Sequence, residues 1–255
     1  MAHTTQESVA YFESAYASAQ VADADYFDRD QKREVAEAEL SFMASLPGGG
    51  RSLLDIGAGS GIFAEVAAAK GYLATAVDPA MGRLATEPGI PFTPVRGTLD
   101  DISPDALFDL VTLWDVVEHA VDPLALLSTA RRHLTDGGWL LLETGNHAAT
   151  HRIWGGPQHW IYKKDHRWYF TPQSVESLLT EAGFCEIVYS DSVLRPQLDR
   201  KVSRSKPSWL RMLKSCARSP GNIATHLSRY RFQRRSMGRQ LPDIGIFALA
   251  AKKVD

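Results

Sequence analysis

A glycine-dense turn between two apolar stretches constrains the fold of this chain more than any other feature. The segment reads LLDIGAGSGIFAEVAAAKGYLATAVDP, with an apolar run up to Asp55, three glycines at alternate positions, a helix-forming stretch and a second apolar run that ends at Asp78. Glycines at a helix N-terminus let bare backbone approach a ligand, and the helix dipole favours polar or anionic groups there. An acid at the tip of the second strand of such a unit is placed to accept hydrogen bonds from a ribose diol. The pattern predicts a nucleotide-cofactor pocket.

The position of the third glycine indicates which cofactor the turn would bind. A dinucleotide fingerprint that starts at Gly57 needs glycine at position 62, where this chain has Ile62, and the third glycine comes one place early at Gly61. The acid before the first glycine would repel a pyrophosphate but suits a cationic ligand that carries an amino acid. The run D-x-G-x-G-x-G from Asp55 to Gly61 resembles motif I of the class I S-adenosylmethionine-dependent methyltransferases. A chance glycine-rich turn is the alternative reading.

Two later blocks extend the resemblance. Residues 108–146, FDLVTLWDVVEHAVDPLALLSTARRHLTDGGWLLLETGN, read as strand, loop, helix, Gly-Gly turn and strand. They resemble the fourth strand, the W-D-V-x-E-H-x-x-D-P segment and the fifth strand of the ubiquinone-biosynthesis-like O-methyltransferase branch, with methyltransferase domains of types 23 and 11. Residues 166–184, HRWYFTPQSVESLLTEAGF, resemble the stretch before the sixth strand of that branch. Together the three blocks cover most of residues 51–193.

Strands that alternate with helical stretches predict an α/β fold with a parallel, doubly wound, Rossmann-like sheet. The resemblance implies seven strands, the last of them antiparallel. We expect an N-terminal helical cap over 1–50, a methyltransferase core over 51–193, a basic helical insert over 194–242 and a final core strand over 243–255. The carboxyl ends of the parallel strands should bring Asp55, Asp78, Thr98, Trp114 and Asn146 to one face.

Composition excludes several classes of protein. The two cysteines, Cys185 and Cys216, are far apart and form no ligand cluster, which argues against a disulfide framework or a zinc site and fits a reducing cytoplasm. The N-terminal residues lack the basic and apolar regions of a signal peptide, and no window approaches 18 uninterrupted apolar residues. We therefore expect a cytoplasmic protein.

The net charge of −2 conceals a basic segment. Residues 195–239 carry 13 Lys or Arg against the single Asp199, and the rest of the chain carries 15 basic against 29 acidic residues. The segment has three readings: it docks an anionic or carrier-bound acceptor, it contacts an anionic membrane surface through Trp209, Leu210, Met212 and Leu213, or it is a solvated helical excursion. Nucleic acid is not an expected partner, because the aromatic interleaving of a single-strand platform is missing. The oligomeric state is not indicated.

The resemblance implies S-adenosylmethionine as the cofactor and assigns its contacts. Asp55 and the backbone around the glycines would meet the methionine part, Asp78 the ribose hydroxyls, and Trp114 would either shape the methionine end or fill the core. The family often has an Asp for the adenine amino group where this chain has Thr98 and Leu99. The full set of expected cofactor residues is Asp55, Gly57, Ala58, Gly59, Gly61, Asp78, Pro79, Thr98, Leu99 and Trp114.

Four residues are candidates for the chemistry at the acceptor. His119 matches a position beside the transferred methyl in this branch, and imidazole has a pKa suited to a base near neutrality; a helix-capping or packing role is the alternative. His147, Tyr162 and His166 follow as base or substrate-orienting candidates. They lie in residues 146–170, an aromatic and histidine-rich stretch that reads as a substrate lid or as a cluster shielding a long loop. No metal site is predicted, because no pair of histidines has ligand spacing with a carboxylate.

The sequence thus predicts a methyltransferase that acts on a small-molecule acceptor, with a hydroxyl of an aromatic, sugar or natural-product intermediate as the expected target. A sulfonium is already an activated methyl donor, so proximity and orientation carry most of the rate. A base is needed only where the acceptor is protonated. The alternatives are N- or C-methylation and a regulatory module that binds the cofactor without catalysis.

Overall fold

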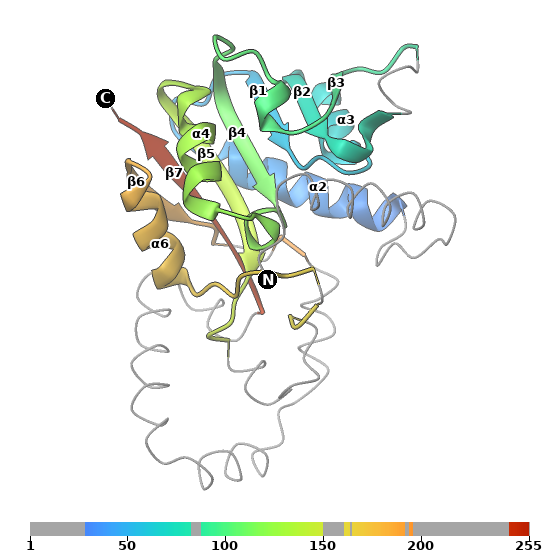
Figure 1. The fold of residues 1–255 in the computed structure, drawn as a ribbon. Helices are drawn as coiled ribbons and strands as arrows, with labels where there is room; N and C mark the ends of the chain where they lie inside the picture. Colours follow the sequence, from blue (N-terminus) through green and yellow to red (C-terminus); the bar gives the residue numbers. More distant parts are fainter. Residues whose placement is uncertain are drawn as a thin grey trace, which may run out of the picture.

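The computed structural model describes residues 29–82, 88–149, 161–163, 165–191, 194–195 and 245–254. These residues form a seven-stranded sheet with helices on both faces (Figure 1), in the order β3-β2-β1-β4-β5-β7-β6. Strands β3, β2, β1, β4 and β5 pair in parallel, and β7 pairs antiparallel with both β5 and β6. The predicted doubly wound sheet with an antiparallel last strand is confirmed.

The strands and helices follow one another in the α/β alternation. The strands are β1 (Ser52–Ile56), β2 (Leu73–Asp78), β3 (Thr93–Arg96), β4 (Phe108–Trp114), β5 (Leu134–Gly145), β6 (Phe184–Tyr189) and β7 (Ile246–Lys253). The α-helices are α2 (Arg29–Ala44), α3 (Ile62–Ala69), α4 (Pro123–Arg132) and α6 (Pro172–Glu181), and short 3-10 helices are η1 (Pro79–Gly82), η3 (Leu99–Asp101) and η4 (Val117–His119). None of the helices in the described ranges is long and apolar enough to cross a membrane.

Alternate residues along the strands divide the core into two layers, one on each face of the sheet. Leu54 and Leu140 belong to the cluster that α4 and α6 cover, and their neighbours Leu53 and Leu141 belong to the cluster that α2 and α3 cover. Figure 1 shows these two helix pairs on opposite sides of the strands. Helix α2, placed by the sequence in the cap of residues 1–50, buries its Met43 in the core cluster. The domain boundaries themselves remain predictions.

The ends of the helices and strands agree with the sequence patterns except at the predicted Gly-Gly turn. Asp122 caps α4, since its Oδ1 accepts a hydrogen bond from Ala125 N at 3.0 Å with Pro123 in the first turn. Strand β3 is short and lies at the sheet edge. The prediction of a turn before the fifth strand was wrong: Gly137 and Gly138 lie inside β5, where the pairing with β4 shifts register. Gly137 has a φ of 76° there, which lets the strand bulge and continue.

The sheet order reverses direction beside β1, because β2 follows on one side and β4 on the other. Ligands of doubly wound sheets bind beyond the carboxyl ends of the strands at such a switch point. The loops after β1, β2, β4 and β5 therefore form the candidate site. Residues 1–28 of the predicted N-terminal cap and residues 196–242 of the predicted insert lie outside the described residues.

Candidate active site

The glycine loop after β1 adopts a conformation that side chains resist. Gly57, Gly59 and Gly61 have φ values of 72°, 54° and 72°, in the left-handed region that costs other residues roughly 1–2 kcal/mol. A Cβ on Gly57 would lie 2.6 Å from Val116 Cγ2. The glycines therefore leave this part of the loop without side chains where β1 and β4 end.

Three N–H groups of this loop form hydrogen bonds within the fold. Gly57 N and Ala58 N both donate to the Val77 carbonyl, at 2.8 and 3.2 Å. Gly61 N donates to the Ala58 carbonyl at 2.9 Å. These bonds fold the loop back onto β2, so the backbone contribution of this part of the loop is close approach rather than a set of donors aimed at a ligand.

Asp78 joins the loop to the tip of β2. The residue is 5% exposed, and its Oδ2 accepts a hydrogen bond from Gly59 N at 2.9 Å. The chain then continues into η1 through half-buried Pro79. The geometry puts a carboxylate at the end of β2 beside the glycine turn, which is where a ribose diol would be recognised.

Asp55 lies inside β1 and is 2% exposed. Its Oδ1 accepts a hydrogen bond from Thr112 Oγ1 at 2.8 Å, and its Oδ2 is buried with no hydrogen-bond partner among the described residues. Burial raises the pKa of Asp55 to about 7, the Thr112 hydrogen bond lowers it, and the charge of Asp78 raises it. A cation bound nearby would favour the ionised form. The site therefore fits a ligand that carries a sulfonium and an ammonium group.

Trp114 ends β4 next to the start of α3. Its ring meets Phe63 edge-on with centroids 5.5 Å apart, and its Nε1 is buried without a hydrogen-bond partner in the described part of the chain. The expected adenine contacts lie on the next loop: Thr98 caps η3 through Asp101, whereas the Leu99 side chain is buried in the core. The cofactor roles of these residues remain predictions.

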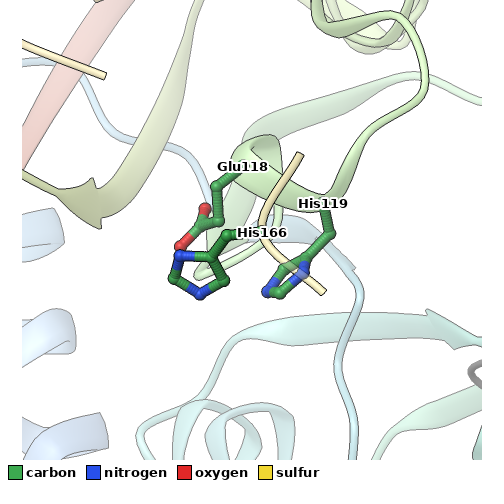
Figure 2. A group of neighbouring side chains, drawn as sticks. All are labelled: Glu118, His119 and His166. Carbon is green, nitrogen blue, oxygen red and sulfur yellow. The ribbon is translucent and has the colours of Figure 1, made fainter. Parts of the chain in front are cut away.

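Glu118, His119 and His166 come together above the end of β4. Figure 2 shows the Glu118 carboxylate and the two imidazole rings gathered in one group, and one ligand atom from each lies within 4.8 Å of the others. The two rings meet edge-on with centroids 4.9 Å apart. Two of the predicted catalytic residues, His119 and His166, are thus 47 positions apart in the sequence and adjacent in the structure. The same three side chains offer a two-histidine, one-carboxylate ligand set; the prediction of no metal site is not tested by this geometry.

The proton position on His119 follows from its backbone partner. His119 Nδ1 lies 2.9 Å from the Asp165 carbonyl oxygen, which can only accept, so Nδ1 carries the proton. In the neutral ring the lone pair is then on Nε2. The Asp165 carboxylate lies 3.8 Å from Nδ1, within ion-pair distance of a protonated ring. The arrangement resembles a base held in one tautomer by its neighbour.

Burial keeps the two residues around His119 uncharged near neutral pH. Burial and the charge of Asp115 raise the pKa of Glu118 to about 8, and its Oε2 has no hydrogen-bond partner among the described residues. Burial and the neighbouring His119 lower the pKa of His166 to about 4. A neutral acid and a neutral imidazole therefore flank the candidate base.

The other two catalytic candidates form a second group connected to the first by Tyr169. Tyr162 Oη and His147 Nε2 are 3.3 Å apart, and both rings pack against Tyr169, with centroids 5.3 and 5.6 Å from it. His166 lies 6.5 Å from the same ring. All four sequence candidates therefore line one region.

Backbone hydrogen bonds fix the segment 165–170 over the turn after β4. Arg167 N and Trp168 N donate to the Glu118 carbonyl at 2.9 and 3.2 Å, and Trp168 Nε1 donates to the Ala120 carbonyl at 2.8 Å. At the far end of the segment, His147 N donates to the Phe170 carbonyl at 2.7 Å. Sequence patterns could not reveal Tyr169 or Asp165 as members of the site, since their roles depend on this crossing.

Comparison with known proteins gives the family. The model of a methyltransferase domain matches residues 27–188. The ubiquinone biosynthesis O-methyltransferase of Cereibacter sphaeroides is 31% identical over 175 residues, which cover 63% of this chain and 71% of that protein. Among solved structures, the 1,6-didemethyltoxoflavin-N1-methyltransferase of Burkholderia thailandensis has a TM-score of 0.60 at 17% identity and covers 99% of this chain and 92% of its own. A methyltransferase of Archaeoglobus fulgidus has a TM-score of 0.54 at 18% identity, covering 89% and 95%.

The fold and the family match define an S-adenosylmethionine-dependent methyltransferase. The chain belongs to the methyltransferase-domain family whose model it matches, and its cofactor is S-adenosylmethionine.

Proposed function

We propose that this enzyme methylates a hydroxyl oxygen of a small-molecule acceptor, with His119 as the general base. The observation that carries the proposal is the bond from His119 Nδ1 to the Asp165 carbonyl, because it leaves Nε2 as the basic nitrogen. A hydroxyl is protonated at neutral pH and needs such a base, which contributes about 10²–10⁴-fold to the rate. The relative from Cereibacter sphaeroides is itself named an O-methyltransferase.

In this proposal each part of the site has a separate role. Asp78 would hold the ribose hydroxyls, and the glycine loop would admit the methionine part past Gly57. The bound cofactor supplies an activated methyl on a sulfonium. His119 would take the acceptor proton on Nε2, and the Asp165 carboxylate would stabilise the resulting imidazolium.

The aromatic group of His147, Tyr162 and Tyr169 would face the acceptor. Tyr162 and Tyr169 are 36% and 40% exposed, unusual for large side chains that pack against one another. Aromatic faces that remain accessible beside a base suit a flat, hydroxylated acceptor. We therefore infer that a phenolic ring stacks there, with its hydroxyl toward His119.

Two acceptors of the same shape test whether the methyl group is transferred to oxygen or to nitrogen. Catechol and 1,2-diaminobenzene have the same shape but offer oxygen or nitrogen, and production of S-adenosylhomocysteine measures either reaction. We expect turnover with catechol that His119→Asn reduces. Asn keeps a donor toward the Asp165 carbonyl but lacks a basic nitrogen. Turnover with the diamine alone would indicate N-methylation, and cofactor binding without turnover of any oxygen, nitrogen or carbon acceptor would favour a regulatory module.

A further inference from the structure

A partly buried arginine joins the end of β4 to the end of β5. Arg195 Nε donates to Glu143 Oε1 at 2.6 Å, and Arg195 Nη2 donates to Asp115 Oδ2. Its side chain is 14% exposed, and the preceding Leu194 is 2% exposed in the cluster under α2 and α3. The dipeptide is therefore anchored both by apolar packing and by a forked ion pair.

Asp115 occupies a strained position at the start of the candidate site. Its φ is 55°, the single positive value for a non-glycine residue in the described part of the chain. A left-handed backbone costs a residue with a Cβ about 1–2 kcal/mol, and it persists only where its surroundings fix it. Asp115 N also donates to the Glu143 carbonyl at 3.1 Å. Arg195 and β5 therefore hold both the side chain and the backbone of Asp115.

This residue directs the chain into η4, which carries Glu118 and His119. A change in the Asp115 backbone would rotate the whole turn and move His119 relative to Asp165. The forked geometry matters, because guanidinium binds two carboxylates in fixed directions whereas an ammonium acts as a point charge.

The charges around Arg195 are balanced only while it is present. Burial raises the pKa of Asp115, but Arg195 and Lys163 outweigh burial and hold it below its usual value. Burial raises the pKa of Glu143 to about 7 despite Arg195, and burial together with Glu143 raises that of Glu39 well above its usual value. The titratable groups that interact with this cluster come from every element around it. They are Glu39 from α2, Asp55 from β1, Glu118 and His119 from η4, Glu143 from β5, and Lys163 and His166 from the acceptor loop.

We propose that Arg195 is a positioning residue for methyl transfer: by bridging Asp115 and Glu143 it fixes the turn that aims His119 at the acceptor. The inference rests on the proposed function and adds a residue from beyond β6 to it. No sequence pattern singled out Arg195, which stood only as the first charge of the basic segment.

The test compares Arg195→Met and Arg195→Lys with the wild-type enzyme, using catechol as acceptor. We expect Arg195→Met to lower kcat on the order of 10²-fold, as for a misplaced catalytic group, while S-adenosylhomocysteine binds with unchanged stoichiometry in calorimetry. Arg195→Lys should recover only part of kcat. In Arg195→Met the half-buried Asp115 loses its nearest positive charge and should ionise at higher pH. The pH profile of kcat should then fall on the acid side, and this fall should be missing in Arg195→Met/Asp115→Asn.

A second readout does not depend on turnover. Long-range proton–nitrogen NMR spectra of the histidine rings report which nitrogen is protonated. His119 should show the Nδ1–H form in the wild type and a mixture in Arg195→Met. His133 is the internal control, because its Nδ1 lies 3.0 Å from the Ala106 carbonyl, outside this cluster.

Wild-type kcat in Arg195→Met, full recovery with lysine, or an unchanged His119 tautomer would overturn the inference. A kcat loss that only follows the loss of folded protein would also do so. If Arg195→Met does not fold, Arg195→Lys carries the same measurements. Failure of the proposed function appears separately, as a wild-type enzyme that methylates no hydroxyl or a His119→Asn variant with full activity.

Discussion

Asp78 has a structural role in the glycine loop and a predicted role in binding the cofactor. One of its oxygens accepts the Gly59 N–H and so closes the glycine loop on β2. The sequence predicted its place at the strand tip from spacing alone. It could not predict the bond to Gly59, because that bond depends on the left-handed backbone of the loop.

Replacing Asp78 with Asn should weaken cofactor binding while leaving the loop intact. The amide oxygen can still accept from Gly59 N, but the charge toward the ribose is lost. Hydrogen bonds to charged groups contribute about 1.5–3 kcal/mol, so the S-adenosylhomocysteine dissociation constant should rise about 10- to 100-fold in calorimetry. Asp105→Asn, at an exposed carboxylate, is the matched control. Equal affinity in Asp78→Asn and the control would remove Asp78 from the cofactor site.

At the same scale, single residues explain where sequence reasoning succeeded and where it stopped. The helix cap formed by Asp122 with Pro123 in the first turn of α4 has a local sequence signature. His119 and His166 were named individually, but their approach to 4.9 Å requires the crossing of segment 165–170 over η4. Asp115, Glu143 and Arg195 were missed because ion pairs between distant segments leave no periodic pattern in the sequence.

At the scale of elements, the glycine loop and η4 depend on each other. Gly57 leaves room for Val116, the residue that precedes η4. The sequence identified the loop from its glycines but gave no sign of this contact. The Gly-Gly pair in β5 illustrates the opposite error, since a bulge and a turn share the same residue preferences.

Gly57→Ala should disturb both elements. The new Cβ would lie 2.6 Å from Val116 Cγ2 at a φ of 72°, and the backbone strain alone is roughly 1–2 kcal/mol. We expect a lower free energy of unfolding in urea and weaker cofactor binding. Gly57→Ala/Val116→Ala should recover part of the loss, since it removes the clash but not the strain; no recovery would show that the contact with Val116 is unimportant.

Removal of metal ions by a chelator distinguishes the two possible roles of Glu118, His119 and His166, which are a site around a general base and a metal site. If His119 acts as a base, activity with catechol should survive dialysis against EDTA, and added Mg²⁺ or Zn²⁺ should not raise kcat. Loss of activity on chelation and its return with one cation would instead assign the three residues as metal ligands.

At the scale of the whole molecule, the sheet and its two helix layers were predictable because strand and helix periodicities alternate along the chain. Seven strands and the antiparallel last one came from the family resemblance, and the structure confirms them. The basic segment 195–239 is described only at Arg195, so an anionic acceptor or membrane partner for the rest of it remains a prediction.

Buried acids should make the folded state less stable as pH rises. The pKa of Asp55 is raised to about 7 and that of Glu118 to about 8, so the native state keeps protons that the unfolded chain releases near pH 4. Each group can lower the free energy of unfolding by up to about 1.4 kcal/mol per pH unit between those values. His166, with its lowered pKa, opposes this trend only below about pH 6.5.

Urea unfolding at a series of pH values between 5.5 and 8 (roughly the window between unfolded and native pKa values) measures this slope. We expect stability to fall across the range and the slope to flatten in Glu118→Gln, which has no proton to lose. A flat or rising stability in the wild type would show that these carboxyls are ionised in the native protein.

The most direct test of the account is the pH profile of kcat for the wild type and His119→Asn with catechol. His119 as the base requires a kcat about 10²–10⁴-fold lower in the variant near neutral pH, with the gap closing as the pH approaches that of phenol ionisation near 10. A variant that matches the wild type at neutral pH would contradict it.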